Sequence, residues 1–466
     1  EPRIDMVFSS NLFLFAFLPL FLACYYAVPL RFRSALILVF SYGFYAWWRP
    51  DFLGLLVGVS FVSYGLALAI DAEVLPSRRY RLLFVGVLLN LLVLAYFKYA
   101  NFGIDSLNLL LQALGMEPLS FGRVLLPIGL SFYIFHAISY LVDIYRKEAP
   151  PANNLIDFSA FIALFPHLVA GPVLRYKLLA EQFRCREHSW ARFSQGCAIF
   201  MVGFCKKVLI ADSVAPLANA AFSATQLSMA DAWLGTVAYT IQLFFDFSGY
   251  SDMAVGLALM IGFTFPQNFD DPYTSGSITE FWKRWHMSLS SWLREYLYIP
   301  LGGNRLGGGR TYLNLFLTMI LGGLWHGASW SFVLWGAWHG GILSIERYWQ
   351  QRFLRVFFPR PLKVAWTMLL VMLGWVLFRA NVLASAMRVW WSLFGLSDLP
   401  LSDAMRWELT PDRSILLLLG VGLVYAMPWL RRHQGGPLRW LLLPLFFWAI
   451  AKLSAQSFTP FLYFQF

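Results

Sequence analysis

The sequence is poor in charged residues. Only 13% of its 466 residues are Asp, Glu, Lys or Arg, whereas a soluble protein has roughly 25%. With 59% hydrophobic residues, the composition argues against a soluble domain and indicates a membrane protein. Acidic residues are scarcer than basic ones, which gives a net charge of +11. The basic residues lie beside hydrophobic segments, so we attribute them to membrane topology and anionic lipid headgroups rather than to nucleic-acid binding.

Several chemical signatures are missing as well. The four cysteines, at positions 24, 185, 197 and 205, have no metal or redox spacing and are expected to be reduced thiols. No cluster of His, Cys and carboxylate residues has metal-site spacing, so we predict no metal. The P-loop pattern is absent, because the glycines of 302–309 are not followed by the Lys-Ser or Lys-Thr that a P-loop requires. No Gly-x-Ser-x-Gly elbow occurs, so a serine nucleophile is not expected.

Long hydrophobic segments are what the chain has instead, and they predict an all-α polytopic membrane protein. The candidate crossings are Leu12–Leu30, Ser34–Trp48, Phe52–Ile70, Leu82–Ala100, Val124–Val142, Gly196–Ile210, Ala232–Ile261, Val364–Phe378, Ile415–Trp429 and Trp440–Leu453. Positive loops stay cytoplasmic, so both termini and the acidic loop Asp398–Asp412 are expected outside. Residues 1–5 precede Met6 and are interpreted as an expression scar. No internal repeat indicates a two-half transporter, so we expect residues 6–466 to form a single transmembrane domain.

His326 is the residue that we expect to carry function. It lies in the uncharged stretch 311–345, and an ionisable group at membrane depth is a functional hypothesis by default. The stretch is too long for one span of about 20 residues. Basic residues flank it on both sides, so it is expected to enter the membrane and return, with Gly322, Gly323 and Gly327 near its turn. Residues 158–174, interrupted by Pro166, are a second re-entrant candidate.

The segment 264–310 departs from the hydrophobic pattern. Ser277-Ile-Thr-Glu280 fits a capping box that opens a helix. Apolar residues from Phe281 to Tyr296 then follow roughly one helical face, opposed by basic and serine residues. The pattern predicts one amphipathic helix that lies in the cytoplasmic interface and includes His286. Such a helix is either a membrane anchor or a lid that attracts an anionic donor.

The motifs resemble those of the membrane-bound O-acyltransferases. The likeness is carried by Phe281–Arg294, by Gly323-Leu-Trp-His-Gly-Ala328, by Phe245–Ala254 and by the opening Met6–Asn11. Together they resemble the bacterial branch that includes the alginate O-acetylase and a relative that acetylates cellulose. The resemblance implies a ring of about 10–11 tilted transmembrane helices with re-entrant segments and a central tunnel. It also implies that the family's invariant histidine is His326 and that a second, variable one is His286.

Histidine in an apolar tunnel suits acyl transfer. Burial disfavours its charged form, so the neutral ring is available as a general base. We predict His326 and His286 as catalytic residues, with Trp325, His167, His136 and Asp246 as tunnel-lining candidates. A structural hydrogen-bonding role remains open for His136, and structural pairing with Ser248, Tyr250 or Arg379 remains open for Asp246. The resemblance implies acetyl-CoA as the donor, and the basic residues expected to bind it are Lys283, Arg284, Arg305 and Arg310.

The predicted function is that of a multi-pass acetyltransferase of the bacterial inner membrane. It takes acetyl from cytosolic acetyl-CoA and passes it across the membrane for O-acetylation of an exopolysaccharide of the alginate or cellulose type. No bound cofactor is expected. Relatives imply a periplasmic or membrane-anchored acetyltransferase partner within a polysaccharide synthesis and secretion complex, and Asp398–Asp412 and Phe458–Phe466 are candidate docking surfaces. The alternatives are acyl or D-alanyl transfer to another polymer, acylation of a lipid or protein, and a non-enzymatic transporter or scaffold.

Overall fold

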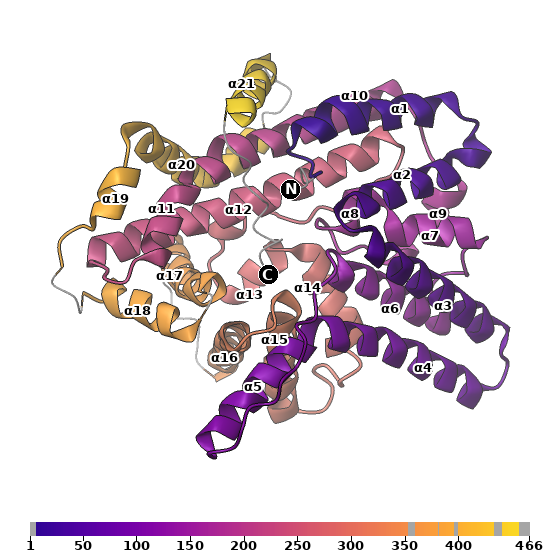
Figure 1. Cartoon of the computed structure of the whole chain (residues 1–466), viewed down its shortest axis with the longest axis horizontal. Helices are drawn as coiled ribbons and strands as arrows, with labels where there is room; N and C mark the ends of the chain where they lie inside the picture. Colours follow the sequence, from indigo (N-terminus) through magenta and orange to yellow (C-terminus); the bar gives the residue numbers. More distant parts are fainter. Residues whose placement is uncertain (1–5, 353–358, 381, 396–398, 433–439, 456–466) are drawn as a thin grey trace. The chain divides into compact units, whose positions relative to one another are not determined.

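A computed structural model of the chain describes residues 6–352, 359–380, 382–395, 399–432 and 440–455. The regular structure of these residues is helical and contains no strand, which confirms the all-α prediction (Figure 1). Residues 1–5 and the C-terminal run Phe458–Phe466, both interpreted above, lie outside the described residues. The chain divides into two compact units, Glu1–Ile199 with Ala254–Pro266 (unit 1) and Phe200–Met253 with Gln267–Phe466 (unit 2).

Unit 1 is built from the N-terminal helices. Their bounds are α1 (Leu18–Ala27), α2 (Arg33–Trp48), α3 (Leu53–Ala72), α4 (Pro76–Leu94), α5 (Ala100–Ala113), α6 (Leu130–Arg146), α7 (Leu155–Ala163), α8 (Phe165–Leu168) and α9 (Tyr176–Arg184). Helices α3, α4 and α6 pack against one another, and α7 packs on α2 and α3. Proline at the first position of α4 suits a helix start, because its missing N–H would have no partner there.

The predicted crossing Val124–Val142 begins too early, because α6 starts only at Leu130. Gly129 precedes the helix with a φ of 75°. A Cβ at this position would lie 2.4 Å from the carbonyl oxygen of Leu168. The left-handed backbone and this close approach both require glycine, so the chain turns at Gly129 before it becomes helical.

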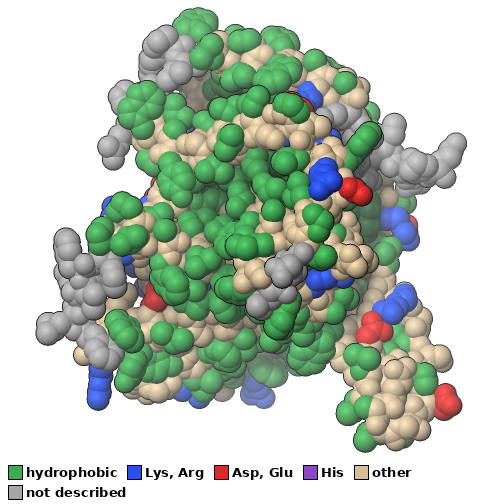
Figure 2. Space-filling view, turned by 90° about the vertical axis from the view of Figure 1, so that its left-hand side faces the viewer, with side chains coloured by type: hydrophobic (Ala, Val, Ile, Leu, Met, Phe, Trp, Pro, Cys, Tyr) green, Lys and Arg blue, Asp and Glu red, His purple; other side chains and the backbone are tan. Residues whose placement is uncertain are grey.

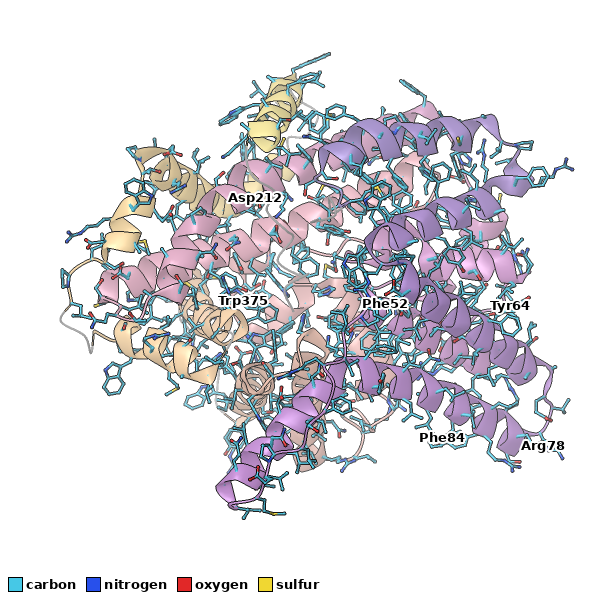
Figure 3. The ribbon with its side chains drawn as sticks, viewed as in Figure 1. Phe52, Tyr64, Arg78, Phe84, Asp212 and Trp375 are labelled. Atoms are coloured by element: carbon cyan, nitrogen blue, oxygen red, sulfur yellow. The ribbon has the colours of Figure 1, made fainter. Side chains whose placement is uncertain are left out.

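The described residues contain four helical segments that are long and apolar enough to cross a membrane: Pro50–Ala72, Pro76–Ala113, Arg360–Arg379 and Pro411–Leu430. Phe13–Ala27 and Leu442–Ala455 are shorter apolar helices. Large hydrophobic side chains remain exposed on these segments; Phe84 on α4, for example, is 56% exposed and points outward (Figure 3). Figure 2 shows a face on which hydrophobic side chains far outnumber charged ones. The ring and the tunnel remain predictions.

Two long helices join the units in sequence, and the rest of unit 2 follows them. The joining helices are α10 (Trp190–Cys205) and α12 (Met229–Met260). The helices of unit 2 are α11 (Asp212–Ser223), α13 (Ile278–Arg284), α14 (Met287–Leu293), α15 (Gly308–His326), α16 (Trp330–Arg352), α17 (Arg360–Arg379), α18 (Leu383–Leu393), α19 (Asp403–Glu408), α20 (Pro411–Arg432) and α21 (Leu442–Ala455). Helix α11 was not predicted; Lys206–Ala211 connects it to α10 as a π-helical turn.

Helices α15 and α16 form a hairpin that covers the stretch predicted to enter and return. They pack tightly because small residues face each other. A Cβ on Gly323 would lie 2.3 Å from the carbonyl oxygen of Phe332, and one on Gly336 would lie 2.4 Å from that of Met319. The turn falls at residues 327–329, so Gly327 is at the turn as expected. Gly323, in contrast, serves the helix crossing rather than the turn.

The single amphipathic helix predicted after Ser277 is wrong. The N-cap at Ser277 is confirmed, since the N–H of Glu280 donates to the Ser277 hydroxyl at 3.0 Å. The Glu280 carboxylate accepts from the N–H of Gly276 at 2.8 Å, one residue before the N–H that a capping box uses. The helix ends at Arg284, and α14 starts only at Met287. Between them His286 adopts a left-handed conformation with φ 45° and ψ 54°. Sequence periodicity missed this break because the apolar spacing continues across it.

Candidate functional site

Unit 2 anchors His286 through backbone and side-chain bonds to one loop residue, Asn268. The N–H of Met287 donates to the Asn268 carbonyl oxygen at 2.9 Å. The Asn268 side-chain oxygen accepts from the Ser288 hydroxyl at 2.8 Å and from the Ser288 N–H at 3.3 Å. Its amide nitrogen donates to the Ser251 hydroxyl at 2.9 Å. These bonds hold the chain reversal at His286, a conformation uncommon for a residue other than glycine.

The same network fixes which ring nitrogen of His286 carries the proton. The nitrogen Nδ1 lies 3.1 Å from the Asn268 side-chain oxygen, and that oxygen is an acceptor because it already accepts from the Ser288 N–H. Nδ1–H is therefore the donor, and Nε2 keeps its lone pair. Nε2 is buried and has no hydrogen-bond partner among the described residues. Burial lowers the pKa of His286 to about 3, so the ring is neutral at physiological pH.

His326, the other predicted catalytic residue, ends α15 beside His286. The two ring centroids are 6.4 Å apart. Trp325, a predicted lining residue, lies against both, with centroid distances of 5.0 Å to His326 and 6.2 Å to His286. Trp335 of α16 and Phe378 of α17 each approach His326 to 5.2 Å, edge to face. The two histidines thus share an aromatic enclosure in which His326 is only 6% exposed.

Sequence reasoning missed a third histidine of this cluster. His339 is fully buried on α16, and its ring lies 5.1 Å from that of Trp335. The indole N–H of Trp282 donates to its Nδ1 at 3.4 Å. A Cβ on Gly374 would lie 2.7 Å from its Nε2, so this nitrogen faces a neighbouring helix. The available signal was the i, i+4 spacing of Trp335 and His339, which puts both on one helical face.

The predicted donor-binding residues occupy two different environments. Lys283, Arg305 and Arg310 are exposed and therefore accessible to an anion. Arg284 is partly buried and makes an ion pair with Glu280 at 2.7 Å. It is thus already committed within α13, whereas the other three remain available.

Asp246 makes a structural ion pair, but not with the partners considered from the sequence. Its carboxylate lies 2.6 Å from the Lys207 Nζ, which also contacts Asp212 at 2.7 Å. Asp212 begins α11 (Figure 3). Arg379, one of the partners considered, donates instead to Asn219 at 2.9 Å. The pairing is between helices far apart in sequence, which composition and spacing do not reveal.

The other two predicted lining histidines pair with each other in unit 1. His136 and His167 stack with ring centroids 4.4 Å apart and an interplanar angle of 24°. His167 Nε2–H donates to the Phe161 carbonyl oxygen at 2.8 Å, and the Leu174 N–H donates to His136 Nε2 at 3.3 Å. Both rings are fully buried. These bonds tie the two histidines to the backbone of the irregular segment around α8.

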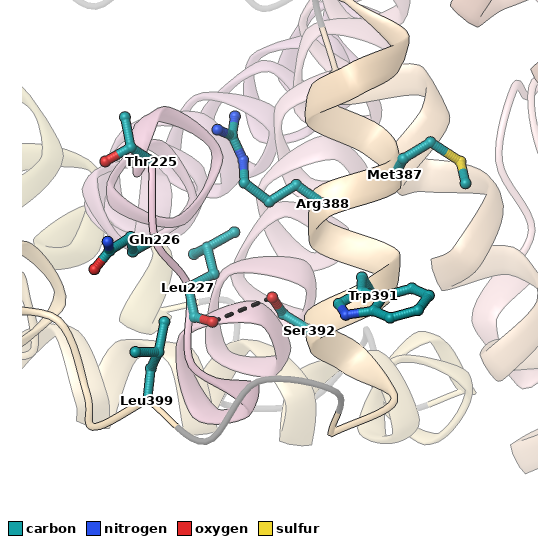
Figure 4. A pocket seen from close by; sticks show the side chains of 8 residues that line it. All are labelled: Thr225, Gln226, Leu227, Met387, Arg388, Trp391, Ser392 and Leu399. Carbon is teal, nitrogen blue, oxygen red and sulfur yellow. Dashed lines mark hydrogen bonds between the residues drawn. The ribbon is translucent and has the colours of Figure 1, made fainter.

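Unit 2 also has an open cleft of about 420 Å³ beside α18. Leu227, Arg388 and Leu399 are among its lining residues (Figure 4). The Ser392 hydroxyl donates to the Leu227 carbonyl oxygen at 3.2 Å and fixes one edge of it. None of the residues predicted to be catalytic lines this cleft, so it is separate from the histidine cluster.

Comparison with known proteins agrees with the motifs. The family described as membrane-bound O-acyltransferase matches residues 145–387. The chain is 50% identical to the probable alginate O-acetylase of Azotobacter vinelandii, over 99% of this chain and 100% of the relative. It is 51% identical to the protein of the same name in Pseudomonas putida, with the same coverage. It is also 36% identical to the peptidoglycan O-acetyltransferase of Helicobacter pylori, over 85% of this chain and 81% of the relative. The chain therefore belongs to the membrane-bound O-acyltransferase family and is an acyltransferase.

Proposed function

We propose that the protein O-acetylates a bacterial exopolysaccharide of the alginate type from the inner membrane. Relatives named for alginate and peptidoglycan O-acetylation support a polysaccharide acceptor. Cytosolic acetyl-CoA is the proposed donor, and its acetyl group crosses the membrane through this chain. The four long apolar helical segments support a multi-pass location.

The proposal rests on the geometry of two buried histidines. The ring centroids of His286 and His326 are 6.4 Å apart, and Nε2 of His286 has no hydrogen-bond partner among the described residues. Acyl transfer to a hydroxyl needs a base for the proton of the nucleophile. The neutral His286 ring, held by Asn268, provides a fixed acceptor at Nε2. His326, enclosed by Trp325, Trp335 and Phe378, is the base that we place closest to the reacting groups.

In the proposed step, the acceptor hydroxyl gives its proton to imidazole as its oxygen attacks the thioester carbonyl of acetyl-CoA. The tetrahedral intermediate then collapses and the carbon–sulfur bond breaks. The imidazolium returns the proton to the leaving thiolate, which departs as CoA. His286 and His326 are the two groups available for this proton, and the desolvated aromatic surroundings keep it from bulk water.

The exposed basic residues Lys283, Arg305 and Arg310 suit the phosphates of the donor. We propose that they gather acetyl-CoA at the cytoplasmic face, a long-range effect that salt would weaken. On the opposite face a periplasmic or membrane-anchored acetyltransferase would receive the acetyl group and place it on the polymer. The described residues 399–412 are part of the candidate docking loop, whereas Asp398 lies outside the described residues.

Purified protein in nanodiscs, given acetyl-CoA labelled in the acetyl group, tests the proposal. We expect CoA release together with label on an oligomannuronate acceptor, or on an added partner protein. The parallel arms contain cello-oligosaccharide and a D-alanyl donor. Label on cello-oligosaccharide alone would show that the acceptor is of the cellulose type rather than the alginate type. Transfer of D-alanine alone would contradict acetylation. Passage of acetyl-CoA across the membrane without thioester cleavage would favour a transporter.

A further inference from the structure

Unit 1 contains two arginines, Arg33 and Arg186, that lie together without a carboxylate beside them. From their geometry we propose that they form a binding site for a phosphate group on an anionic molecule. The proposal is independent of the acetyl-transfer chemistry, because every residue that it uses belongs to unit 1 and none to the histidine cluster of unit 2.

Arg33 starts α2 and is held by aromatic and histidine side chains. Its Nη1 donates to His188 Nε2 at 3.0 Å. Its guanidinium carbon lies 4.8 Å from the Tyr25 ring centroid and 5.5 Å from that of Tyr26. Because Arg33 donates to Nε2, this nitrogen of His188 carries a lone pair and no proton. Burial, and then the two arginines, lower the pKa of His188, so it remains neutral at physiological pH.

Arg186 reaches the same place from the loop after α9. Its Nη2 donates to the hydroxyl of Ser34, the residue next to Arg33, at 2.9 Å. The guanidinium carbon lies 5.1 Å from the Phe263 ring centroid. The Tyr25 hydroxyl lies near both guanidinium groups, but Nη1 of Arg186 is buried and has no partner within hydrogen-bond distance among the described residues. A buried guanidinium N–H without an acceptor is costly, and a ligand oxygen would satisfy it.

The neighbouring arginines are neutralised, which makes this pair distinctive. Arg184 lies 3.7 Å from Glu181, and Arg192 lies 2.6 Å from Glu187. In the described part of the chain neither Arg33 nor Arg186 has a carboxylate within ion-pair distance. Asp157 acts on Arg186 only from farther away, and its carboxylate accepts from the Asn154 amide at 2.9 Å.

Two like charges at one place repel each other, and their partial burial strengthens the repulsion. An anion between them would remove that cost. Guanidinium groups match phosphate in geometry as well as in charge, since each can offer two parallel N–H donors. A phosphate group is therefore the ligand chemistry that fits best.

The surroundings suggest how such a group would arrive. Leu30, Phe32 and Trp190 are 63%, 51% and 79% exposed and flank the arginines in sequence. Positive loops also favour the cytoplasmic side, where anionic headgroups lie. The phosphate could thus be the headgroup of an anionic phospholipid or a soluble phosphate. Binding experiments with each probe distinguish these two sources.

Thermal unfolding of the full chain in detergent tests the site. Phosphatidylglycerol, phosphatidylcholine, sodium phosphate and sodium chloride of matched ionic strength are titrated separately. We expect saturable stabilisation by phosphatidylglycerol, by sodium phosphate or by both, and not by phosphatidylcholine or chloride. Arg33→Gln and Arg186→Gln should each weaken this binding by about tenfold or more. Arg186→Lys keeps the charge but loses the fork, so it should weaken binding less.

Arg31→Gln is the matched control. Arg31 is exposed and its guanidinium carbon lies 4.7 Å from the Phe32 ring centroid, so its loss removes a nearby charge while leaving the proposed site intact. Stabilisation by phosphatidylglycerol alone assigns the site to a lipid headgroup, and stabilisation by sodium phosphate assigns it to the phosphate group itself. Equal stabilisation of the native chain and both glutamine variants would overturn the proposal. Equal effects of phosphatidylglycerol and phosphatidylcholine, or no effect of either lipid or phosphate, would overturn it as well. If the glutamine variants do not fold, stabilisation by phosphatidylglycerol and sodium phosphate is compared between Arg186→Lys and Arg31→Gln. Weaker binding by Arg186→Lys supports the site, and equal binding overturns it.

Discussion

Each unit of the chain buries two neighbouring histidines, and the two pairs are held by different kinds of group. In unit 1, His136 and His167 stack at 4.4 Å and bond to backbone groups. In unit 2, His286 and His326 lie 6.4 Å apart at an interplanar angle of 58°, and His286 is held by the side chain of Asn268. His136, His167 and His286 each keep one buried ring nitrogen without a hydrogen-bond partner among the described residues. The pairs therefore differ in what holds the rings, which is the backbone of unit 1 in one case and the Asn268 side chain in the other.

The largest expected effect on acetyl transfer is that of replacing His326. His326→Gln should reduce acetyl transfer by about 10²–10⁴-fold, the usual contribution of a general base. Single-turnover CoA release in nanodiscs measures it. His339→Gln is the control from the same aromatic cluster, because His339 bonds to Trp282 and faces Gly374. A similar loss in both variants would indicate damage to the cluster rather than loss of a base.

Asn268 should come next, because it fixes the proton of His286 on Nδ1. Asn268→Leu removes the oxygen that accepts from Nδ1–H, so the proton of His286 can move to Nε2. We expect kcat to fall about 10–100-fold with little change in KM, as when other residues that orient a functional histidine are lost. Asn268→Asp keeps an acceptor and should recover most of the activity. If Asn268→Leu is as active as the native chain, then the ring nitrogen on which His286 carries its proton does not affect acetyl transfer.

The unit 1 pair should affect stability rather than turnover. His167→Leu leaves the Phe161 carbonyl oxygen without its donor, which should cost about 1–3 kcal/mol of unfolding free energy. Activity per folded molecule should stay close to native. Denaturant titration with acetyl-transfer assays on the monodisperse fraction measures both. A loss of activity in a variant of native stability would show that His167 takes part in the reaction.

The smallest expected effect is a pH dependence of stability that His286 contributes. Its pKa is about 3 in the folded protein and about 6.5 when unfolded. The unfolded state therefore takes up a proton first, and stability that is complete above about pH 6.5 is lost as the pH falls toward 3. Between pH 7.5 and 5.0 the native chain should lose up to about 2 kcal/mol more than His286→Gln. Equal losses would show that the ring is not held neutral.

The sequence predicts the parts of the molecule that depend on local pattern. Hydrophobic runs located α3, α4, α17 and α20, and the capping box located the start of α13. His286 and His326 were each predicted to be catalytic, and the structure brings their ring centroids to 6.4 Å. The resemblance to the family's motifs, rather than composition, singled out His286 and supported the choice of His326.

What could not be predicted depends on contacts between distant residues. The chain reverses at His286 because Asn268 and Ser251, far away in sequence, hold it, whereas the local apolar spacing reads as continuous helix. Lys207 reaches Asp246 from another helix, so the partner of that carboxylate was missed. His339 was not among the predicted site residues, because its place in the cluster depends on contacts with Trp282 and Trp335.

The central claim is that catalysis belongs to the unit 2 pair. It is tested most directly by one assay of four matched variants, His136→Gln, His167→Gln, His286→Gln and His326→Gln. Each is compared with the native chain in label transfer from acetyl-CoA per folded molecule. The account predicts that transfer falls strongly at positions 286 and 326 and stays near native at 136 and 167. Full transfer in His326→Gln, with loss at 136 or 167, would contradict it.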